Sequence, residues 1–389
     1  MVILMRTLEV LEAILKSAQE PRAQVDAANT LAEYLVRADL VRCGLLVEET
    51  LVKARQLGYR LGEATALRQR AVCNLIRADL EAADTDYQAA LALSRHEGFG
   101  EIEASCLLGL STLRRKVTDY PEAMSLLLEA RRLRQQQGDV RGEVATLNNL
   151  GALCVELGSY DQATAFLLQG LKLSREHVLP EYEIFCLSNF AGIKREAGEL
   201  EEAIEDLQVC LERALELENH YVRPHLLASL CETYLKQGQI EEALRVNEEA
   251  LALASTGTDR QVELSLLVHL GIICDELGMP EAAEAAFTRA LDRTKRLGDL
   301  ERHLEALCQT AAFYQRQQRN AEARQAFQEA RDQAQLAGAR RHLARILRGL
   351  ASLEPESLVH YETQAEAIEV ELKEQALKSN QLAQEAWGL

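Results

Sequence analysis

The side chains that could do acid–base or metal chemistry are spread along the chain. Its eight histidines form no HExxH pair and have no Cys or carboxylate at a paired-ligand spacing. They are His96, His177, His220, His225, His269, His303, His342 and His360. A structural or catalytic metal needs three or four ligands at such spacings. The sequence therefore predicts no metal site.

The nine cysteines give no sign of thiol chemistry. They contain no CxxC pair and stand among Leu and Ala residues in helical patterns. Such cysteines behave as small apolar packing residues that stay reduced in a cytoplasmic protein. We expect Cys154, Cys231 and Cys274 in particular to be buried and inert.

No motif for phosphate binding or nucleophilic catalysis is present. The chain has neither a GxxxxGK[ST] loop nor a GxGxxG segment after a strand. The run at 109–111 ends in Ser but lies within a helical pattern, so it has no preceding strand from which to form a nucleophile elbow. We expect a protein that is not an enzyme and that needs no cofactor.

Composition and charge exclude further classes. The 389 residues carry 61 acidic and 43 basic side chains, a net charge of -18, which disfavours a nucleic-acid partner because such affinity rests on Lys and Arg at phosphates. No apolar run approaches the ~18 residues that a membrane span needs. The N-terminus also lacks the features of a signal peptide. We therefore predict a cytoplasmic protein without a membrane partner.

A repeat of 40 residues determines which elements can form. Aligning the chain at this period brings one column of small residues together: Cys43, Ala83, Ala123, Ala163, Ala203, Ala243, Ala283 and Ala323. A second column follows seven residues later: Thr50, Ala90, Ala130, Gly170, Cys210, Ala250, Ala290 and Ala330. Small residues at a fixed register indicate that two helices approach closely there.

Each repeat contains two helical patterns separated by a turn, for example 144–157 and 161–176. Gly158 offers a left-handed helix end, and both Asp119 followed by Glu122 and Ser159 followed by Gln162 offer a capping box. The segment 147–173, with Leu150-Gly151, Gly158-Ser-Tyr160 and Ala163, resembles the tetratricopeptide repeat. Its longer period is similar to that of kinesin light chains and many bacterial regulators.

The resemblance covers residues 20 to 350 and implies an all-α fold, a right-handed α-solenoid superhelix of antiparallel helix pairs. We expect an N-terminal helix in 1–19, eight units and a ninth helix A in 20–353, and a C-terminal helix in 354–389. The same resemblance implies a concave face lined by the first helix, helix A, of each pair.

The C-terminal segment has a different pattern. After Pro355 apolar residues follow a 3,4 spacing through Tyr361, Ala365, Ile368 and Leu372, as in a coiled coil. One interpretation is a capping helix on the last repeat. The other is a homodimer through residues 356–389, since the segment resembles the linkers that join such repeats to bacterial signalling output domains.

Polar positions of helix A form the candidate binding site. One column reads Asn29, Gln69, Gly109, Asn149, Asn189, Ser229, His269 and Gln309, and Asn148 lies beside it. In similar long-repeat proteins this column holds the main chain of an extended peptide, which amides can do because they donate and accept together. The alternative is a polar wall in contact with water.

Basic residues flank this column: Arg68, Arg115, Lys116 and Arg195. Together they favour a carboxylate-bearing partner, and the alternative is that they are solvated on a helix face. The leading functional hypothesis is a non-catalytic scaffold that binds a protein or acidic peptide in bacterial regulation. The others are a dimerising sensor that controls a cyclase or kinase output domain, and a peptide-regulated phosphatase, which the missing N-terminal bundle disfavours.

Overall fold

The computed structural model describes residues 2–77, 79–217, 219, 222–256 and 260–387, and within these ranges the chain forms helices and no strand. Helices A are α2 (Pro21–Ala38), α4 (Arg60–Ile76), α6 (Gly100–Lys116), α8 (Val140–Glu156), α10 (Pro180–Ala197), α12 (Val222–Gln237), α14 (Arg260–Glu276), α16 (Leu300–Arg316) and α18 (Arg340–Leu353). Helices B are α3 (Leu40–Gln56), α5 (Leu80–Glu97), α7 (Tyr120–Gln137), α9 (Tyr160–Glu176), α11 (Leu200–Glu216), α13 (Ile240–Thr256), α15 (Pro280–Leu297) and α17 (Asn320–Leu336). Helix α1 (Val2–Ser17) precedes them, and η1 (Pro355–Ser357) and α19 (Leu358–Trp387) follow.

The small-residue columns form the contacts between helices. All eight residues of the first column, from Cys43 to Ala323, are 0% exposed. Most of the second column is equally buried. The prediction that these positions lie in the helix contacts is confirmed, and with it the all-α solenoid of paired helices.

The turns explain the period. Among the described residues, a left-handed residue ends helices at intervals of 20 or 40 residues. Nine of these positions are glycine: Gly58, Gly98, Gly138, Gly158, Gly198, Gly238, Gly278, Gly298 and Gly338. Glycine has no Cβ to clash in this conformation. Three positions hold a larger residue, namely Thr118, Val178 and Gln318, with φ of 60°, 54° and 60°. Each repeat is thus two helix-and-turn steps of equal length.

The N-terminal caps of the helices agree only in part with those that the sequence predicts. Asp119 caps α7 by accepting from the Glu122 amide at 3.4 Å, as the capping box predicts. Ser159 does not cap α9, so that prediction is wrong. Its hydroxyl donates instead to Asn380 Oδ1 at 2.6 Å, which lies in α19.

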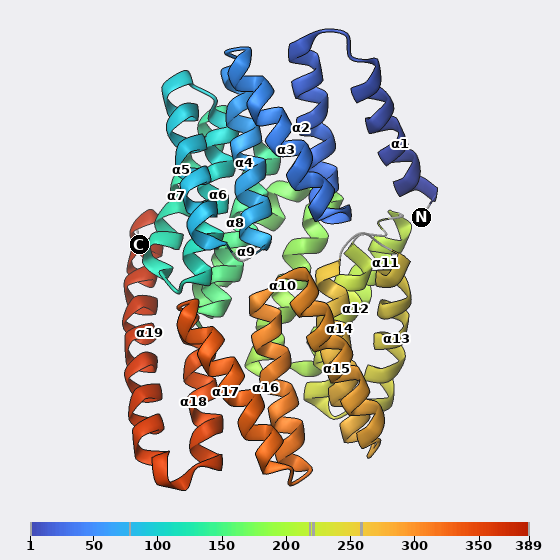
Figure 1. The fold of residues 1–389 in the computed structure, drawn as a ribbon, viewed down its shortest axis with the longest axis vertical. Coiled ribbons are helices and arrows are strands. Elements are labelled where there is room, and N and C mark those ends of the chain that lie inside the picture. The colour runs from blue at the N-terminus through green and yellow to red at the C-terminus, as the bar shows by residue number, and fades with distance from the viewer. Residues whose placement is uncertain (1, 78, 218, 220–221, 257–259, 388–389) are drawn as a thin grey trace.

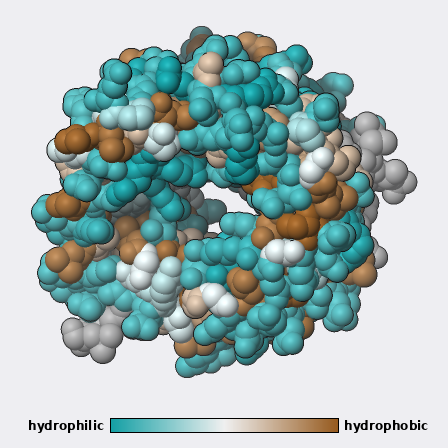
Figure 2. All heavy atoms as spheres, turned by 90° about the horizontal axis from the view of Figure 1, so that it is seen from below, coloured by the Kyte–Doolittle hydropathy of each residue, from teal (hydrophilic) through white to brown (hydrophobic). Residues whose placement is uncertain are grey.

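The repeats follow one superhelical turn. Neighbouring helices A pack on one another, as in α8 with α10 and α12 with α14, so the array curves toward them and they line the inner surface. The early repeats come to lie above the late repeats, with α4 to α7 in an upper layer and α16 to α18 in a lower one (Figure 1). Seen along the superhelix, the molecule is a ring around a narrow opening (Figure 2).

Helix α19 connects the two layers. It packs on α18 at its beginning and on α7 and α9 farther along, and it runs along the outside of both layers (Figure 1). Tyr361 and Ala365 belong to the apolar 3,4 pattern of α19, which we call its seam. They are 9% and 0% exposed because they pack on other helices of the same chain. The 3,4 pattern therefore reflects packing within this chain.

Candidate binding surface on the inner face

Residues 40 or 41 positions apart meet on the inner face, because consecutive helices A present the same positions to each other. Asn189 of α10 donates to Asn148 of α8 at 2.7 Å. Arg316 donates to Asp275 at 2.6 Å. Asn149, the neighbour of Asn148, is half-buried. The inner face is thus a ladder of side-chain contacts between repeats.

The first two residues of the predicted column do not lie on an open wall. Asn29 is 5% exposed and donates to the Gly62 carbonyl oxygen at 3.2 Å. Gln69 is 2% exposed. An extended peptide cannot reach such side chains. We therefore remove both from the candidate site and assign them to the packing of α2, α4 and their neighbours.

The later residues of the column stay half-buried. Gln309 donates to Glu305 within α16 at 2.8 Å. His269 has a buried Nδ1 without a partner among the described residues, and burial lowers the pKa of its imidazole. A neutral imidazole at this place could donate to, or accept from, a ligand group.

The predicted basic cluster is neutralised within the protein. Arg115 contacts Glu156 at 2.7 Å. Arg195 contacts Glu232 at 3.2 Å, and Arg68 lies 3.9 Å from Glu33. Each guanidinium therefore has a carboxylate, so the inner face offers paired charges. A carboxylate-bearing partner has to compete with these pairs.

A cavity of about 730 Å³ lies where the upper layer meets the lower one. It is lined by the ends of α4, α6 and α8, by the first turns of α16 and α18, and by Leu80 of α5 and Tyr120 of α7. Its polar lining includes Arg115, Glu156, Glu305 and Arg345, and Leu75, Leu300 and Leu304 supply apolar wall. A mixed wall of this size suits an extended segment of a few residues.

Two ion pairs join the layers at the cavity. Lys116 of α6 contacts Glu301 of α16 at 2.8 Å, and Arg341 of α18 contacts Glu156 of α8 at 2.7 Å. Each pair joins residues 185 positions apart. Sequence reasoning missed Glu301 and Arg341 as site residues, since a 40-residue alignment does not give the pitch at which one superhelical turn meets the next.

The electrostatic surroundings shift several groups in the cavity. Burial alone would raise the pKa of Glu301, but Lys116, His342 and Arg302 together outweigh burial, so this pKa lies below its usual value. Burial would also raise the pKa of Glu305, but Arg345, Gln309 and His342 together lower this pKa below its usual value. Burial, aided by Arg345, lowers the pKa of His342. At neutral pH the carboxylates are therefore ionised and this imidazole is neutral.

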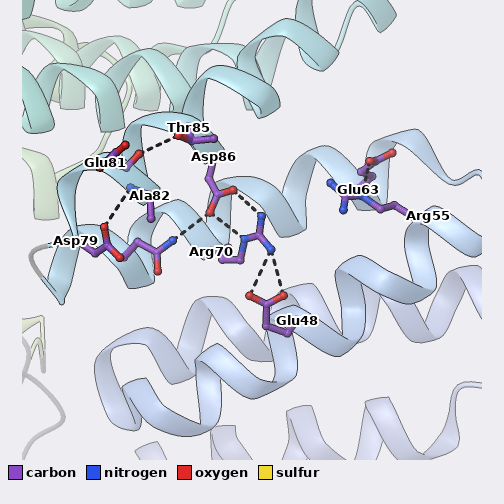
Figure 3. A network of polar contacts seen from close by, with 10 residues as sticks. Glu48, Arg55, Glu63, Arg70, Asp79, Glu81, Ala82, Thr85 and Asp86 are labelled. Atoms are coloured by element: carbon purple, nitrogen blue, oxygen red, sulfur yellow. Dashed lines mark hydrogen bonds and ion pairs between the residues drawn. The ribbon is translucent and has the colours of Figure 1, made fainter.

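A partly buried ionic network lies away from the cavity. Arg70 of α4 donates to Asp86 of α5 at 2.6 and 2.8 Å and contacts Glu48 of α3 at 3.1 Å (Figure 3). Asn74 adds a bond to the same Asp86 carboxylate at 3.1 Å. Every group of the network bonds another, so it joins three helices and offers no vacant reactive atom.

No other chemistry-bearing cluster stands out in the described ranges. They contain no group of three or more His, Cys, Asp or Glu able to hold a metal ion. All nine cysteines are free and buried, and burial raises the pKa of Cys154 and of Cys231 to about 12. In the same part of the chain, no helix is both long and apolar enough to cross a membrane.

Comparison with known proteins agrees with this architecture. The tetratricopeptide-repeat family model matches residues 103–176 and 222–296. A comparison with curated proteins found no match.

Solved structures share the fold over most of the chain. A Rap protein complexed with competence and sporulation factor is 15% identical, with a TM-score of 0.62 over 92% of this chain and 99% of its own. The apo quorum sensor NprR from B. thuringiensis is 13% identical, with a TM-score of 0.57 over 85% and 92%. Aspartyl phosphate phosphatase F from Bacillus subtilis is 14% identical, with a TM-score of 0.56 over 76% of each chain.

Proposed function

Since the chain is a tetratricopeptide-repeat protein, we propose that it is a non-catalytic regulatory scaffold that binds a peptide, or an extended segment of a partner protein, on its inner face. The observation that carries this proposal is the cavity of about 730 Å³ between the layers, with polar and apolar wall supplied by five helices A. Similar solved structures support it, because one holds competence and sporulation factor and another is a quorum sensor.

The chemistry of the wall favours a ligand that can exchange hydrogen bonds with paired charges. Two ion pairs on the cavity wall are Arg115 with Glu156 and Arg345 with Glu305, the second pair at 2.5 Å. A peptide main chain offers donors and acceptors in alternation, so it can bond to both members of such pairs. We expect side chains of either charge to be accepted, with an acidic residue bound where it displaces Glu156.

The cellular setting belongs to the same proposal. Nine free thiols fit a reducing cytoplasm. The 34 Arg against 9 Lys in the sequence agree with a GC-rich bacterial genome and so with bacterial regulation. A dimeric sensor would have to use a surface other than the inner seam of α19, because Ala365 and Ser379 of that seam are 0% exposed within one chain.

The test is selection of peptides from a displayed random library against the full chain, followed by calorimetry with the selected peptides. Asn149→Ala should weaken binding by about 0.5–1.5 kcal/mol, the net worth of a hydrogen bond. Glu156→Ala should strengthen the binding of an acidic peptide, because that peptide no longer has to displace this carboxylate from Arg115 and Arg341. Glu212→Ala, at an exposed position of α11, is the control and should bind like the unmodified chain.

Two results would count against the inner face. One is equal affinity of all three variants for every selected peptide. The other is hydrogen-exchange protection on helices B alone when a peptide binds. Arg115→Ala should also reduce the salt dependence of binding to an acidic peptide, since exposed charge attraction is screened over about 10 Å at 0.1 M salt.

A further inference from the structure

Helix α19 has a firmly attached first half. Tyr361 and Ala365 lie in the core formed with α17 and α18, and the Tyr361 hydroxyl donates to Glu354 at 3.0 Å. Arg348 of α18 makes two bonds to Glu369, both of 2.8 Å. An aromatic anchor and a two-bond ion pair thus fix this half to the lower layer.

The second half of α19 crosses to the upper layer. Ala383 is 0% exposed and belongs to the core that contains Met124 of α7 and Phe166 of α9. Asn380 accepts from Ser159 through its side chain at 2.6 Å and from Gln162 through its main chain at 3.0 Å. These contacts join residues more than 200 positions apart in the sequence.

Because α19 is one continuous helix of 30 residues, its two halves move together. At a rise of about 1.5 Å per residue it is a strut of roughly 45 Å between the layers. Figure 1 shows it running from the foot of the lower layer, beside α18, up to the side of α7. If the second half leaves α7 and α9, the ion pairs Lys116–Glu301 and Arg341–Glu156 still join the layers at the cavity, and both are partly exposed pairs of small net value.

The contact of the second half is suited to release. Its fully buried residues, Ser379 and Ala383, are small, and Leu382 is only partly buried there, whereas the first half buries Tyr361. Gln375 also keeps a buried Oε1 without a partner among the described residues, which weakens the contact. The two ends of one helix therefore differ in how firmly they hold.

We propose that α19 is an intramolecular clasp: its second half, docked on α7 and α9, holds the superhelical turn closed and so limits access to the inner face. This inference rests on the proposed function only in naming the inner face as the binding site. Closure itself is a property of the chain alone. Release of the clasp would separate the layers and admit a bulky segment to the cavity.

The test measures access to the inner face without any ligand. Thr112→Cys places one thiol at an exposed position on the cavity wall, whereas the nine native thiols are buried. Its rate of reaction is measured with a maleimide that carries a long polyethylene glycol chain and with N-ethylmaleimide. Glu212→Cys on α11 reports the rate at an outer position.

Two variants of α19 introduce a glutamate, one on the face packed against α7 and α9 and one on the exposed face. Ala383→Glu places it in the α7–α9 contact, and Gln384→Glu places it one residue later at an exposed position. In the Thr112→Cys background, Ala383→Glu should raise the rate at which the bulky reagent labels the introduced thiol by about tenfold, the effect of a tenfold rise in the open population. Gln384→Glu should leave this rate unchanged. Far-ultraviolet dichroism and unreactive native thiols show that the solenoid is intact.

A crosslink gives the opposite perturbation if Ala383→Glu unfolds the chain. Ser159→Cys with Asn380→Cys joins positions whose side chains are 2.6 Å apart, so oxidation with diamide should lock the clasp. In the Thr112→Cys background, the bulky reagent should label position 112, identified by peptide mass mapping, more slowly in the locked form than in the reduced form. Labelling of the two introduced clasp thiols is counted separately. Equal rates in the locked and reduced forms, or in Ala383→Glu and Gln384→Glu with intact helices, would overturn the clasp. Failure to bind any peptide would instead count against the proposed function and leave these rates as they are.

Discussion

Val178 has a left-handed backbone conformation that is unfavourable for a β-branched residue, so replacing it with glycine should stabilise the protein. It ends α9 at φ 54°, where most equivalent positions hold glycine. A left-handed conformation costs a residue with a Cβ about 1–2 kcal/mol, and a β-branched residue stands at the upper end. Glycine avoids this strain but loses about 0.5–1 kcal/mol more backbone entropy on folding. The difference predicts that Val178→Gly raises the free energy of unfolding by about 1–1.5 kcal/mol.

The side chain itself contributes little that would be lost. Val178 is 81% exposed, so its removal returns hardly any apolar surface to water. Gly198 provides the reverse experiment twenty residues later, at φ 88° and with open space around a built Cβ. Gly198→Val should therefore destabilise by about 1–1.5 kcal/mol, with no steric clash to confuse the result.

Urea unfolding followed by dichroism, together with hydrogen exchange in the last turns of α9 and α10, measures both effects. Exchange is needed because a repeat array can open locally before it unfolds as a whole. A neutral or destabilising Val178→Gly, together with a neutral Gly198→Val at unchanged m-values, would refute the strain argument.

Three further predictions follow from buried groups. Ala203→Leu should overpack a position that is 0% exposed and lower the free energy of unfolding by about 1–3 kcal/mol in urea titration, and an unchanged midpoint would contradict this. A thiol reagent should titrate nine cysteines in the denatured protein but react far more slowly in the native one at Cys154 and Cys231, whose pKa is raised to about 12 by burial. Burial lowers the pKa of His303 and His342, so the unfolded chain binds protons first as pH falls. The stability contributed by these neutral imidazoles should then be present above the ordinary histidine pKa of ~6.5 and be lost as pH falls below it, and a flat profile of unfolding midpoints would contradict the assignment.

The period of the sequence was sufficient to predict the fold because both turns of every repeat use the same short-range chemistry. A column such as Ala163 and Ala203 reports a contact between helices that are neighbours in sequence, so its position can be read from spacing alone. The Asp119 cap is equally local. Contacts of this kind do not depend on how far the superhelix turns.

The candidate site depended on longer distances, and here spacing was not enough. Asn29 shares its column with Asn149, yet it is buried because α2 lies close to α4 at Gly62, where a Cβ would stand 2.5 Å from Val25. The contact of Ser159 with Asn380 and that of Lys116 with Glu301 depend on the pitch of a whole superhelical turn. The pitch is the sum of small rotations between successive repeats. It therefore cannot be predicted from any single column of the aligned sequence.

The ion pairs between the layers favour one particular number of repeats, because a change in that number would bring different charges together. Lys116 meets Glu301 and Arg341 meets Glu156, both at a separation of 185 residues. Losing one 40-residue unit between them would bring Arg341 opposite Lys116, a meeting of two cations. Gaining one unit would bring Glu301 opposite Glu156, a meeting of two anions. Repeat arrays usually change length by duplication or deletion of a unit. Either change would place two like charges against each other where the upper layer meets the lower one, and their repulsion disfavours it.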